Sequence, residues 1–227
     1  MRRAAPRSAA AATAEAADTP ARSRRTATGR FVLPSPGYAA IMNAYSHHLG
    51  LDDFMLEMGR EPVSSLTHER LMDLVHRLRL SDALIESRAC FTEDQYARNL
   101  VCRTPAFELL VLCWKPGHES TIHDHVGSLN AISVFAGELT SRVFRPVSGQ
   151  PAGTGPVEMT GEDLVRPGQG WIGVDRAGIH QLANTGSADL ITVHVYAPAL
   201  MELAVYSTES PEVERRPLRY TLAEDLA

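Results

Sequence analysis

The sequence predicts a mainly β chain, an antiparallel barrel or sandwich with a helical segment before it. From residue 38 to about residue 97, apolar residues recur three and four positions apart, as on one face of a helix. After Phe107, short runs rich in β-branched and aromatic residues alternate with Gly, Pro, Asn and Asp clusters, which is typical of antiparallel strands. A chain of 227 residues can bury one sizeable core and is short for two, so we expect one main domain.

The first thirty residues are rich in Ala, Arg, Ser and Thr and hold almost no large apolar side chains. Such a segment cannot bury enough surface to offset the entropy of ordering it, so residues 1–30 are expected to form a disordered tail. An organelle transit peptide shares the Arg- and Ser-rich composition, but Glu15, Asp18 and two prolines count against that alternative.

Residues 31–100 are expected to form a helical extension that packs on the barrel and belongs to the same structural domain. We expect about three helices, and Ser81 with Asp82 is a candidate cap for a helix that runs toward Arg88. The apolar residues at helical spacing are Ile41, Tyr45 and Leu49, followed by Leu71, Leu74, Val75 and Leu78.

The barrel itself and a C-terminal segment are expected over residues 101–227. Five runs in this part have the composition of strands. They are FELLVLCW, LNAISVFAG, ELTSRVFRPV, GWIGV and DLITVHVYAP.

Charge and hydropathy exclude several classes of protein. Residues 1–30 carry seven Arg against two acidic residues, so a net charge of −10 falls on the rest of the chain within the total of −5. An acidic body argues against a nucleic-acid surface on the folded part. No apolar run approaches the roughly 18 to 20 residues that span a bilayer, and the N-terminus lacks an apolar signal region. We therefore expect neither a membrane protein nor an exported one.

The three cysteines indicate the compartment. Cys90, Cys102 and Cys113 show no CxxC spacing and cannot all pair with one another. A disulfide framework is therefore not expected, and a reducing cytoplasm fits this cysteine usage best.

The strongest local signal for chemistry is the segment GHESTIHDH, which ends in His123 and His125. Alternate side chains of a strand share a face, so these imidazoles can both point into the barrel and bind one ion. His180, in GIHQLAN, is a third candidate, and three imidazoles without a carboxylate suit Zn, Fe, Ni or Cu better than Mg or Ca. Two alternatives stay open at this point, since His118 could replace His180 and an HxH pair also arises by chance.

Several motifs taken together resemble the cupin superfamily and, within it, the thiol dioxygenases of the cysteine dioxygenase family. The spacing G-x5-H-x-H, followed by Gly137 and then by His180-x3-Asn184, is similar to the two cupin motifs. The resemblance covers roughly residues 60–205 and implies a jelly-roll-like cupin barrel. The segments in family order are YARNLV, LCW with the following GH, IHDH, GIHQLAN and TVHVYAP.

The resemblance implies that His123, His125 and His180 bind a mononuclear non-haem Fe(II). A carboxylate completes most oxygenase sites of this kind, and a typical cupin has a glutamate at the position of Asn130. Three neutral ligands leave the metal at a charge of +2, so a substrate thiolate can supply the missing negative charge.

The resemblance also gives Arg98 a role, because it matches the family arginine that binds the substrate carboxylate. A guanidinium group pairs with a carboxylate through two parallel hydrogen bonds, which fixes distance as well as charge. Close relatives that oxidise 3-mercaptopropionate carry glutamine there, so Arg98 favours cysteine as substrate. Without the surrounding motif, a surface arginine at a helix end would be the ordinary interpretation.

Thr192, His194 and Tyr196 are two residues apart along one expected strand, so they face the same side. The resemblance implies a relay of hydroxyl, imidazole and phenol that places Tyr196 near the metal, with Thr192 in place of the commoner serine. In the alternative interpretation, Tyr196 only packs in the barrel and His194 is its structural partner.

Asn130 is a departure from the family pattern. Animal members have at this position a cysteine that crosslinks to the active-site tyrosine, and bacterial members usually have glycine. None of the three cysteines takes this position, so no crosslink is expected, and Asn130 could instead narrow the substrate pocket or donate a hydrogen bond. Tyr96 is similar to a pocket residue of the family, whereas Cys113 and Trp114 are expected to be barrel packing.

The resemblance therefore implies an enzyme of the bacterial type that oxidises L-cysteine to cysteine sulfinate, a step of cysteine catabolism. Its expected partners are a small thiol and O2, and a monomer is expected from the family. One alternative is a thiol dioxygenase for another thiol acid, such as 3-mercaptopropionate, and a second is a cupin that binds metal without turnover. A Zn or Ni hydrolase or isomerase would need a general base, and no glutamate lies at a recognisable motif position.

Overall fold

The computed structural model of the chain describes residues 47–60, 62–148 and 153–223. The expected tail over residues 1–30 and the start of the helical extension, residues 31–46, lie outside this part. No helix within the described ranges is long and apolar enough to cross a membrane.

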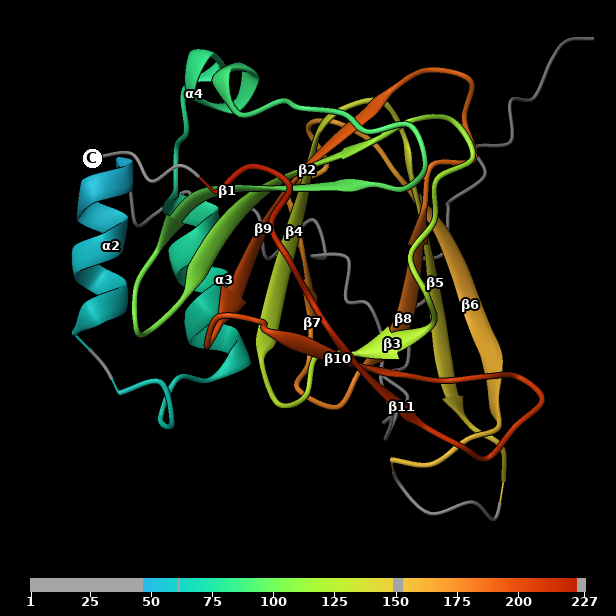
Figure 1. Ribbon diagram of the computed structural model, residues 1–227. Helices are drawn as coiled ribbons and strands as arrows, with labels where there is room; N and C mark the ends of the chain where they lie inside the picture. Colours follow the sequence, from blue (N-terminus) through green and yellow to red (C-terminus); the bar gives the residue numbers. More distant parts are fainter. Residues whose placement is uncertain (1–46, 61, 149–152, 224–227) are drawn as a thin grey trace, which may run out of the picture.

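Three helices precede eleven strands in the described part of the chain (Figure 1). The helices are α2 (Leu51–Gly59), α3 (His68–Arg77) and α4 (Asp82–Ser87). The strands are β1 (Ala97–Arg103), β2 (Glu108–Trp114), β3 (His123–Asp124), β4 (Leu129–Ala136), β5 (Leu139–Pro146), β6 (Val157–Val165), β7 (Trp171–Val174), β8 (Ile179–Ala183), β9 (Leu190–Ala197), β10 (Glu202–Val205) and β11 (Glu214–Pro217).

The strands form two antiparallel sheets that face each other. One sheet has the order β1-β2-β9-β4-β7, and the other has the order β11-β10-β3-β8-β5-β6. In Figure 1, α2 and α3 lie beside the five-stranded sheet, on the side away from β5 and β6. The predicted fold class, a mainly β barrel with an N-terminal helical extension, is confirmed.

Side-chain caps start helices α3 and α4. The Thr67 hydroxyl oxygen accepts a hydrogen bond from the Arg70 N–H at 3.2 Å, and α3 follows. Ser81 caps α4 in the same way, by accepting from the Leu84 N–H at 3.2 Å, as its position in the sequence predicts. Helix α3 then packs against β4 and β7.

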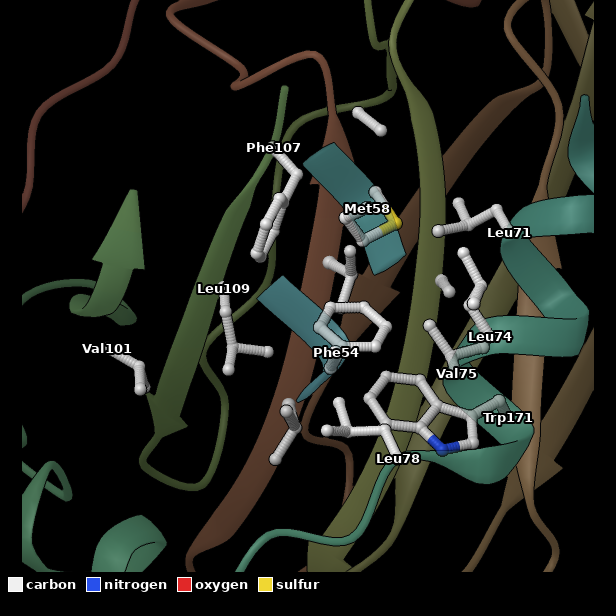
Figure 2. Close-up of a cluster of buried hydrophobic side chains, with 14 of the residues drawn as sticks. Phe54, Met58, Leu71, Leu74, Val75, Leu78, Val101, Phe107, Leu109 and Trp171 are labelled. Atoms are coloured by element: carbon white, nitrogen blue, oxygen red, sulfur yellow. The ribbon is translucent and has the colours of Figure 1, made fainter. Parts of the chain in front are cut away.

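Strand alternation divides the five-stranded sheet between two cores. In β2, Leu109 and Val111 pack with the helices, whereas Leu110 and Leu112 face the other sheet. Because both faces of β2 are covered, its sequence is a continuous apolar run rather than an alternating one. Each fully buried leucine contributes roughly 1.5 to 3 kcal/mol to folding. Figure 2 shows the core on the helix side, where side chains of α2 and α3 meet Leu109 and Trp171.

Gly137 makes the tight connection between β4 and β5. Its φ is 82°, and a Cβ at this position would lie 2.6 Å from the backbone oxygen of Asp189. Only glycine fits such a close approach at positive φ, so the turn that joins β4 to β5 requires glycine at position 137.

Candidate metal centre

Three histidines of the six-stranded sheet and its adjoining loop meet inside the barrel. His123 begins β3, and its register partner in the neighbouring strand β8 is His180. His125 follows directly after β3. All three side chains are buried, and their candidate ligand nitrogens lie within 4.8 Å of one another. The structure thus brings together the three residues that the motifs single out as ligands.

Hydrogen bonds decide which ring nitrogens face the centre of this cluster. His123 Nδ1 lies 2.8 Å from the Thr121 carbonyl oxygen, which can only accept, so Nδ1 carries the proton and Nε2 keeps its lone pair. The Nε2 atoms of His125 and His180 are 2.9 Å apart. Two nitrogens that each lie about 2.1 Å from a shared ion, at a right angle, are about 3 Å apart. The spacing of the donor atoms therefore fits one transition-metal ion.

Burial keeps these imidazoles in the form that binds metal. It lowers the pKa of His123 to about 4, although the hydrogen bond to Thr121 and the Asp124 carboxylate act in the opposite direction. Burial is also the largest cause that lowers the pKa of His125 and His180 well below the usual value, followed by the charge of His123 beside them. The three rings are thus neutral at pH 7, and their lone pairs are available to a metal.

His118 is not part of the cluster, so the alternative ligand set is wrong for this structure. Its Nδ1 accepts from the Lys115 N–H at 3.1 Å, and its Nε2 lies 3.0 Å from the Glu93 carbonyl oxygen. One ring nitrogen thereby bonds to the loop after β2 and the other to the segment before β1, so His118 links these two segments.

Asp124 lies between two cluster histidines, but its carboxylate has other partners. One oxygen accepts from the Tyr206 hydroxyl at 2.6 Å, and the other accepts from the Val126 N–H at 2.8 Å. These bonds hold the chain just before and after His125. Asp124 and Tyr206 are positioning residues that the sequence motifs do not reveal.

The predicted relay on β9 is present as a chain of hydrogen bonds. His194 Nε2 lies 2.9 Å from the Thr192 hydroxyl oxygen, and its Nδ1 lies 3.2 Å from the Tyr196 hydroxyl oxygen. The rings of Tyr196 and His125 meet edge to face, with centroids 5.3 Å apart. The phenol therefore lies beside the three-histidine cluster.

Trp114 sets the direction of the hydrogen bonds along this relay. The sequence predicts only a packing role for this residue. Its indole N–H donates to the Thr192 hydroxyl oxygen at 2.9 Å. An indole can only donate, and the other partner of that hydroxyl is His194, so the Thr192 proton points to His194 Nε2. His194 then donates from Nδ1 to the Tyr196 oxygen. The Tyr196 oxygen is thus the acceptor of this bond, and its own proton is left for another partner.

The buried histidines predict that metal-free protein loses stability in mild acid. The folded-state pKa is about 4 for His123 and about 3 for His194, mainly because of burial, whereas an unfolded histidine has a pKa of about 6.5. Between these values the unfolded chain binds more protons, so the free energy of unfolding falls as the pH drops below about 6.5 and stays level above it. Each such histidine contributes up to about 1.4 kcal/mol per pH unit.

Urea unfolding of metal-free protein at pH 7.5, 6 and 5 measures this dependence. A His194→Asn variant should lose less stability than the wild type over the same range. An equal loss in both proteins would contradict the assignment to buried neutral histidines.

Arg98 lies on β1 inside the barrel, so a surface role is wrong. Only 5% of the residue is exposed, and Nη2 donates to Glu108 Oε1 at 3.1 Å. Its Nε is buried and has no hydrogen-bond partner in the described structure. The guanidinium carbon lies 5.6 Å from the centroid of the Tyr196 ring. Arg98 thus offers an unused donor next to the relay.

Tyr96 and Asn130 complete the set of predicted residues. Tyr96 stacks on Trp114, with ring centroids 4.2 Å apart. Asn130 is fully buried on β4 and is the register partner of Tyr196. Its Nδ2 donates to the Val195 carbonyl oxygen at 3.1 Å, and its Oδ1 has no partner among the described residues. Asn130 thus donates to the backbone, and its Oδ1 is left as a buried acceptor.

Glu108 is the largest omission from the sequence-based set. Its side chain is completely buried and pairs with Arg98. The sequence does mark Glu108 as unusual, because it is the one charged residue in the apolar run FELLVLCW.

A two-sheet barrel with three buried histidines converging inside it defines a metal-binding protein of the cupin class. Residues 68–209 match the family described as Cysteine dioxygenase type I. The match takes in more than half of the chain, and the chain belongs to this family. The extent agrees with the resemblance that the motifs indicate.

Curated relatives include Cysteine dioxygenase type 1 of Danio rerio, which is 31% identical over 113 residues, 48% of this chain and 55% of that protein. The Homo sapiens protein of the same name is 30% identical over 112 residues, 48% of this chain and 54% of its own length. The chain thus matches about half the length of these relatives.

Solved structures show a weaker likeness. The protein TT1209 from Thermus thermophilus is 19% identical, with a TM-score of 0.42 over 53% of this chain and 97% of that one. A cupin superfamily protein from Desulfitobacterium hafniense is 12% identical, with a TM-score of 0.39 over 53% of this chain and 91% of that one. These likenesses say nothing about activity.

Proposed function

We propose that this chain is a mononuclear iron thiol dioxygenase and that L-cysteine is its substrate. The observation that carries the proposal is that the candidate metal ligands, the relay tyrosine and a buried arginine all lie inside the same barrel. Three neutral histidines converge there beside the Tyr196 hydroxyl, and Arg98 lies over the Tyr196 ring with an unused buried donor. Family membership supports the same chemistry.

The donor set fits Fe(II). His123, His125 and His180 offer three nitrogen ligands at suitable spacing, and no carboxylate joins them in the described cluster. A set of neutral ligands leaves the full charge of the ion to be balanced by a substrate thiolate. When bound, Fe(II) would provide open positions for the thiolate and O2 and would mediate the transfer of electrons from sulfur to O2.

Two side chains would hold the ends of the substrate that do not react. Arg98 Nε is a buried donor without a partner, and a substrate carboxylate would satisfy it with a charge-assisted hydrogen bond. Asn130 Oδ1 is a buried acceptor without a partner, and the amino group of cysteine would satisfy that atom. Together the two orphan atoms favour an amino acid thiol over 3-mercaptopropionate, which has no amino group.

Tyr196 would serve as a fixed hydrogen-bond donor to the bound substrate. Burial raises the pKa of its phenol above the usual value, so the hydroxyl keeps its proton at neutral pH. The relay through His194 and Thr192 orients the phenol oxygen, and Trp114 anchors the far end of the relay.

The overall reaction is balanced without a further reductant. The thiol R–SH and O2 give the sulfinic acid R–SO2H, which loses its proton at neutral pH. Both oxygen atoms enter the product, and the sulfur supplies all four electrons.

The test of the proposed function is O2 uptake by anaerobically Fe(II)-loaded protein with cysteine, 3-mercaptopropionate and cysteamine, with the product identified by mass spectrometry. We expect cysteine to be oxidised fastest, at least about tenfold faster in kcat/KM than either analogue. Each analogue lacks one of the two anchoring groups. A tenfold lower kcat/KM corresponds to an activation free energy that is higher by about 1.4 kcal/mol.

Other outcomes would change the proposal in defined ways. A preference for 3-mercaptopropionate would keep the dioxygenase reaction and contradict the role of Asn130 in amine recognition. No uptake with any thiol, despite a full complement of iron, would favour a cupin that binds metal without turnover.

A further inference from the structure

Glu108 is a buried carboxylate inside an apolar strand. It is the first residue of β2, on the same face as Leu110 and Leu112, which point into the barrel. Its side chain is 0% exposed. Burial of an ionised carboxylate is costly unless hydrogen bonds and an opposite charge compensate it.

Three donors compensate the Glu108 carboxylate. Oε1 accepts from Arg98 Nη2 at 3.1 Å and from the Leu200 N–H at 3.1 Å. Oε2 accepts from the Tyr220 hydroxyl at 2.5 Å. The donors come from β1, from the loop after β9 and from the C-terminal segment, so the carboxylate is fixed from three sides.

The same contacts fix the Arg98 guanidinium. The bond to Glu108 uses Nη2, and the Leu200 carbonyl oxygen lies 3.4 Å from the same atom. The rings of Tyr196 and Tyr220 lie 5.6 and 5.9 Å from the guanidinium carbon. Nε remains without a partner among the described residues. Glu108 therefore occupies one part of the guanidinium and leaves another part for a ligand.

We propose that Glu108 is a positioning residue that aims Arg98 and so selects thiols with one carboxylate. This inference rests on the proposed function, because it concerns the group that would hold the substrate carboxylate. Glu108 does not touch the substrate and acts through Arg98.

Charge supports the selection of a single carboxylate. Arg98 and Glu108 together are neutral, and three histidines that bind a metal ion are neutral as well. The only excess charge at the centre would be the +2 of the metal. A cysteine with a thiolate and an unprotonated amino group would carry one negative charge on sulfur and one on the carboxylate, which would balance this excess. A second acidic group on the substrate would be left without a counter-charge in a buried site, which is unfavourable.

The experiment measures binding rather than turnover, on full-length protein loaded with Zn(II), which does not react with O2. Isothermal titration calorimetry gives the Kd of cysteine and of cysteamine for wild type, Glu108→Ala and Glu108→Gln. Glutamine keeps an oxygen acceptor for Arg98 and for the Leu200 N–H. Glu108→Gln therefore tests whether a side chain of similar shape preserves the binding of cysteine. Glu158→Gln is the matched control, because Glu158 is paired with Arg145 at the exposed edge of the barrel.

We expect Glu108→Ala to weaken cysteine binding at least tenfold and cysteamine binding less than threefold. Glu108→Gln should bind cysteine within about threefold of the wild type, and Glu158→Gln should match the wild type for both ligands. Thermal unfolding of each loaded protein shows whether it is folded.

Three results would overturn the inference. These are an equal loss for cysteine and cysteamine, unchanged or tighter cysteine binding in Glu108→Ala, and a Glu108→Gln variant as weak as the alanine variant. Failure of the proposed function would look different, because wild-type protein loaded with Fe(II) would then take up no O2 with any thiol, whatever the Kd values of the Glu108 variants.

Discussion

Replacement of His180 by alanine should remove the bound metal and nearly all thiol oxidation. His180 supplies one of three converging nitrogens, and its Nε2 lies 2.9 Å from that of His125. Two remaining imidazoles hold an ion far more weakly than three, so we expect at least a tenfold loss of iron per chain after desalting. Activity with cysteine should fall about a hundredfold or more, because removal of a ligand exceeds the 10- to 100-fold effect of its hydrogen-bonding partners. Metal analysis and O2 uptake measure the two effects.

His118→Ala is the matched control for this variant. His118 belongs to the motif segment that also contains His123 and His125, but both of its ring nitrogens bond to the backbone. The control should keep full iron content and a rate close to that of the wild type. If His180→Ala retained wild-type iron while His118→Ala lost it, the assignment of His123, His125 and His180 as ligands would be refuted.

Replacement of Arg98 by glutamine should impair cysteine far more than cysteamine. The change removes a buried positive charge whose Nε is free to bind a carboxylate. A hydrogen bond to a charged group contributes about 1.5 to 3 kcal/mol, and the bond from Nε to the substrate carboxylate would be lost. We expect kcat/KM for cysteine to fall about 30- to 150-fold, which corresponds to about 2 to 3 kcal/mol. Cysteamine lacks the carboxylate and should lose less than threefold.

Arg142→Gln makes the same chemical change at the protein surface. Arg142 pairs with Glu119 and Glu162 on the outside of the six-stranded sheet. Both thiols should react at wild-type rates with this variant. Equal losses for cysteine and cysteamine in Arg98→Gln would show that Arg98 supports the fold rather than the substrate.

Much of the barrel could be predicted because its strands bury apolar side chains. Each of the five expected runs is a strand in the structure: β2, β4, β5, β7 and β9. By contrast, β6 reads VEMTGEDLV, and most of its side chains are exposed on an edge of the sheet. Water satisfies its polar residues, so no apolar pattern marks the strand. The two-residue strand β3 is too short to show any pattern at all.

The candidate site also has one part that could be predicted from the sequence and another part that could not. Side chains of a single strand at fixed spacing, such as Thr192, His194 and Tyr196, could be placed together from sequence. Contacts between distant segments that no family motif marks could not. Tyr220 and Glu108 are 112 residues apart in sequence, and only the folded chain brings them within hydrogen-bond distance.

The C-terminal segment also protects an edge of the fold. β1 is the outer strand of the five-stranded sheet, and its backbone exchanges hydrogen bonds with residues near the end of the chain. Leu100 N–H donates to the Leu222 carbonyl oxygen at 2.8 Å, and Thr221 N–H donates to the Arg98 carbonyl oxygen at 2.7 Å. An uncovered edge strand is a template for pairing with another molecule. Proteolytic loss of residues 220–227 would therefore promote aggregation and, by removing Tyr220 from Glu108, should weaken thiol binding in the same preparation.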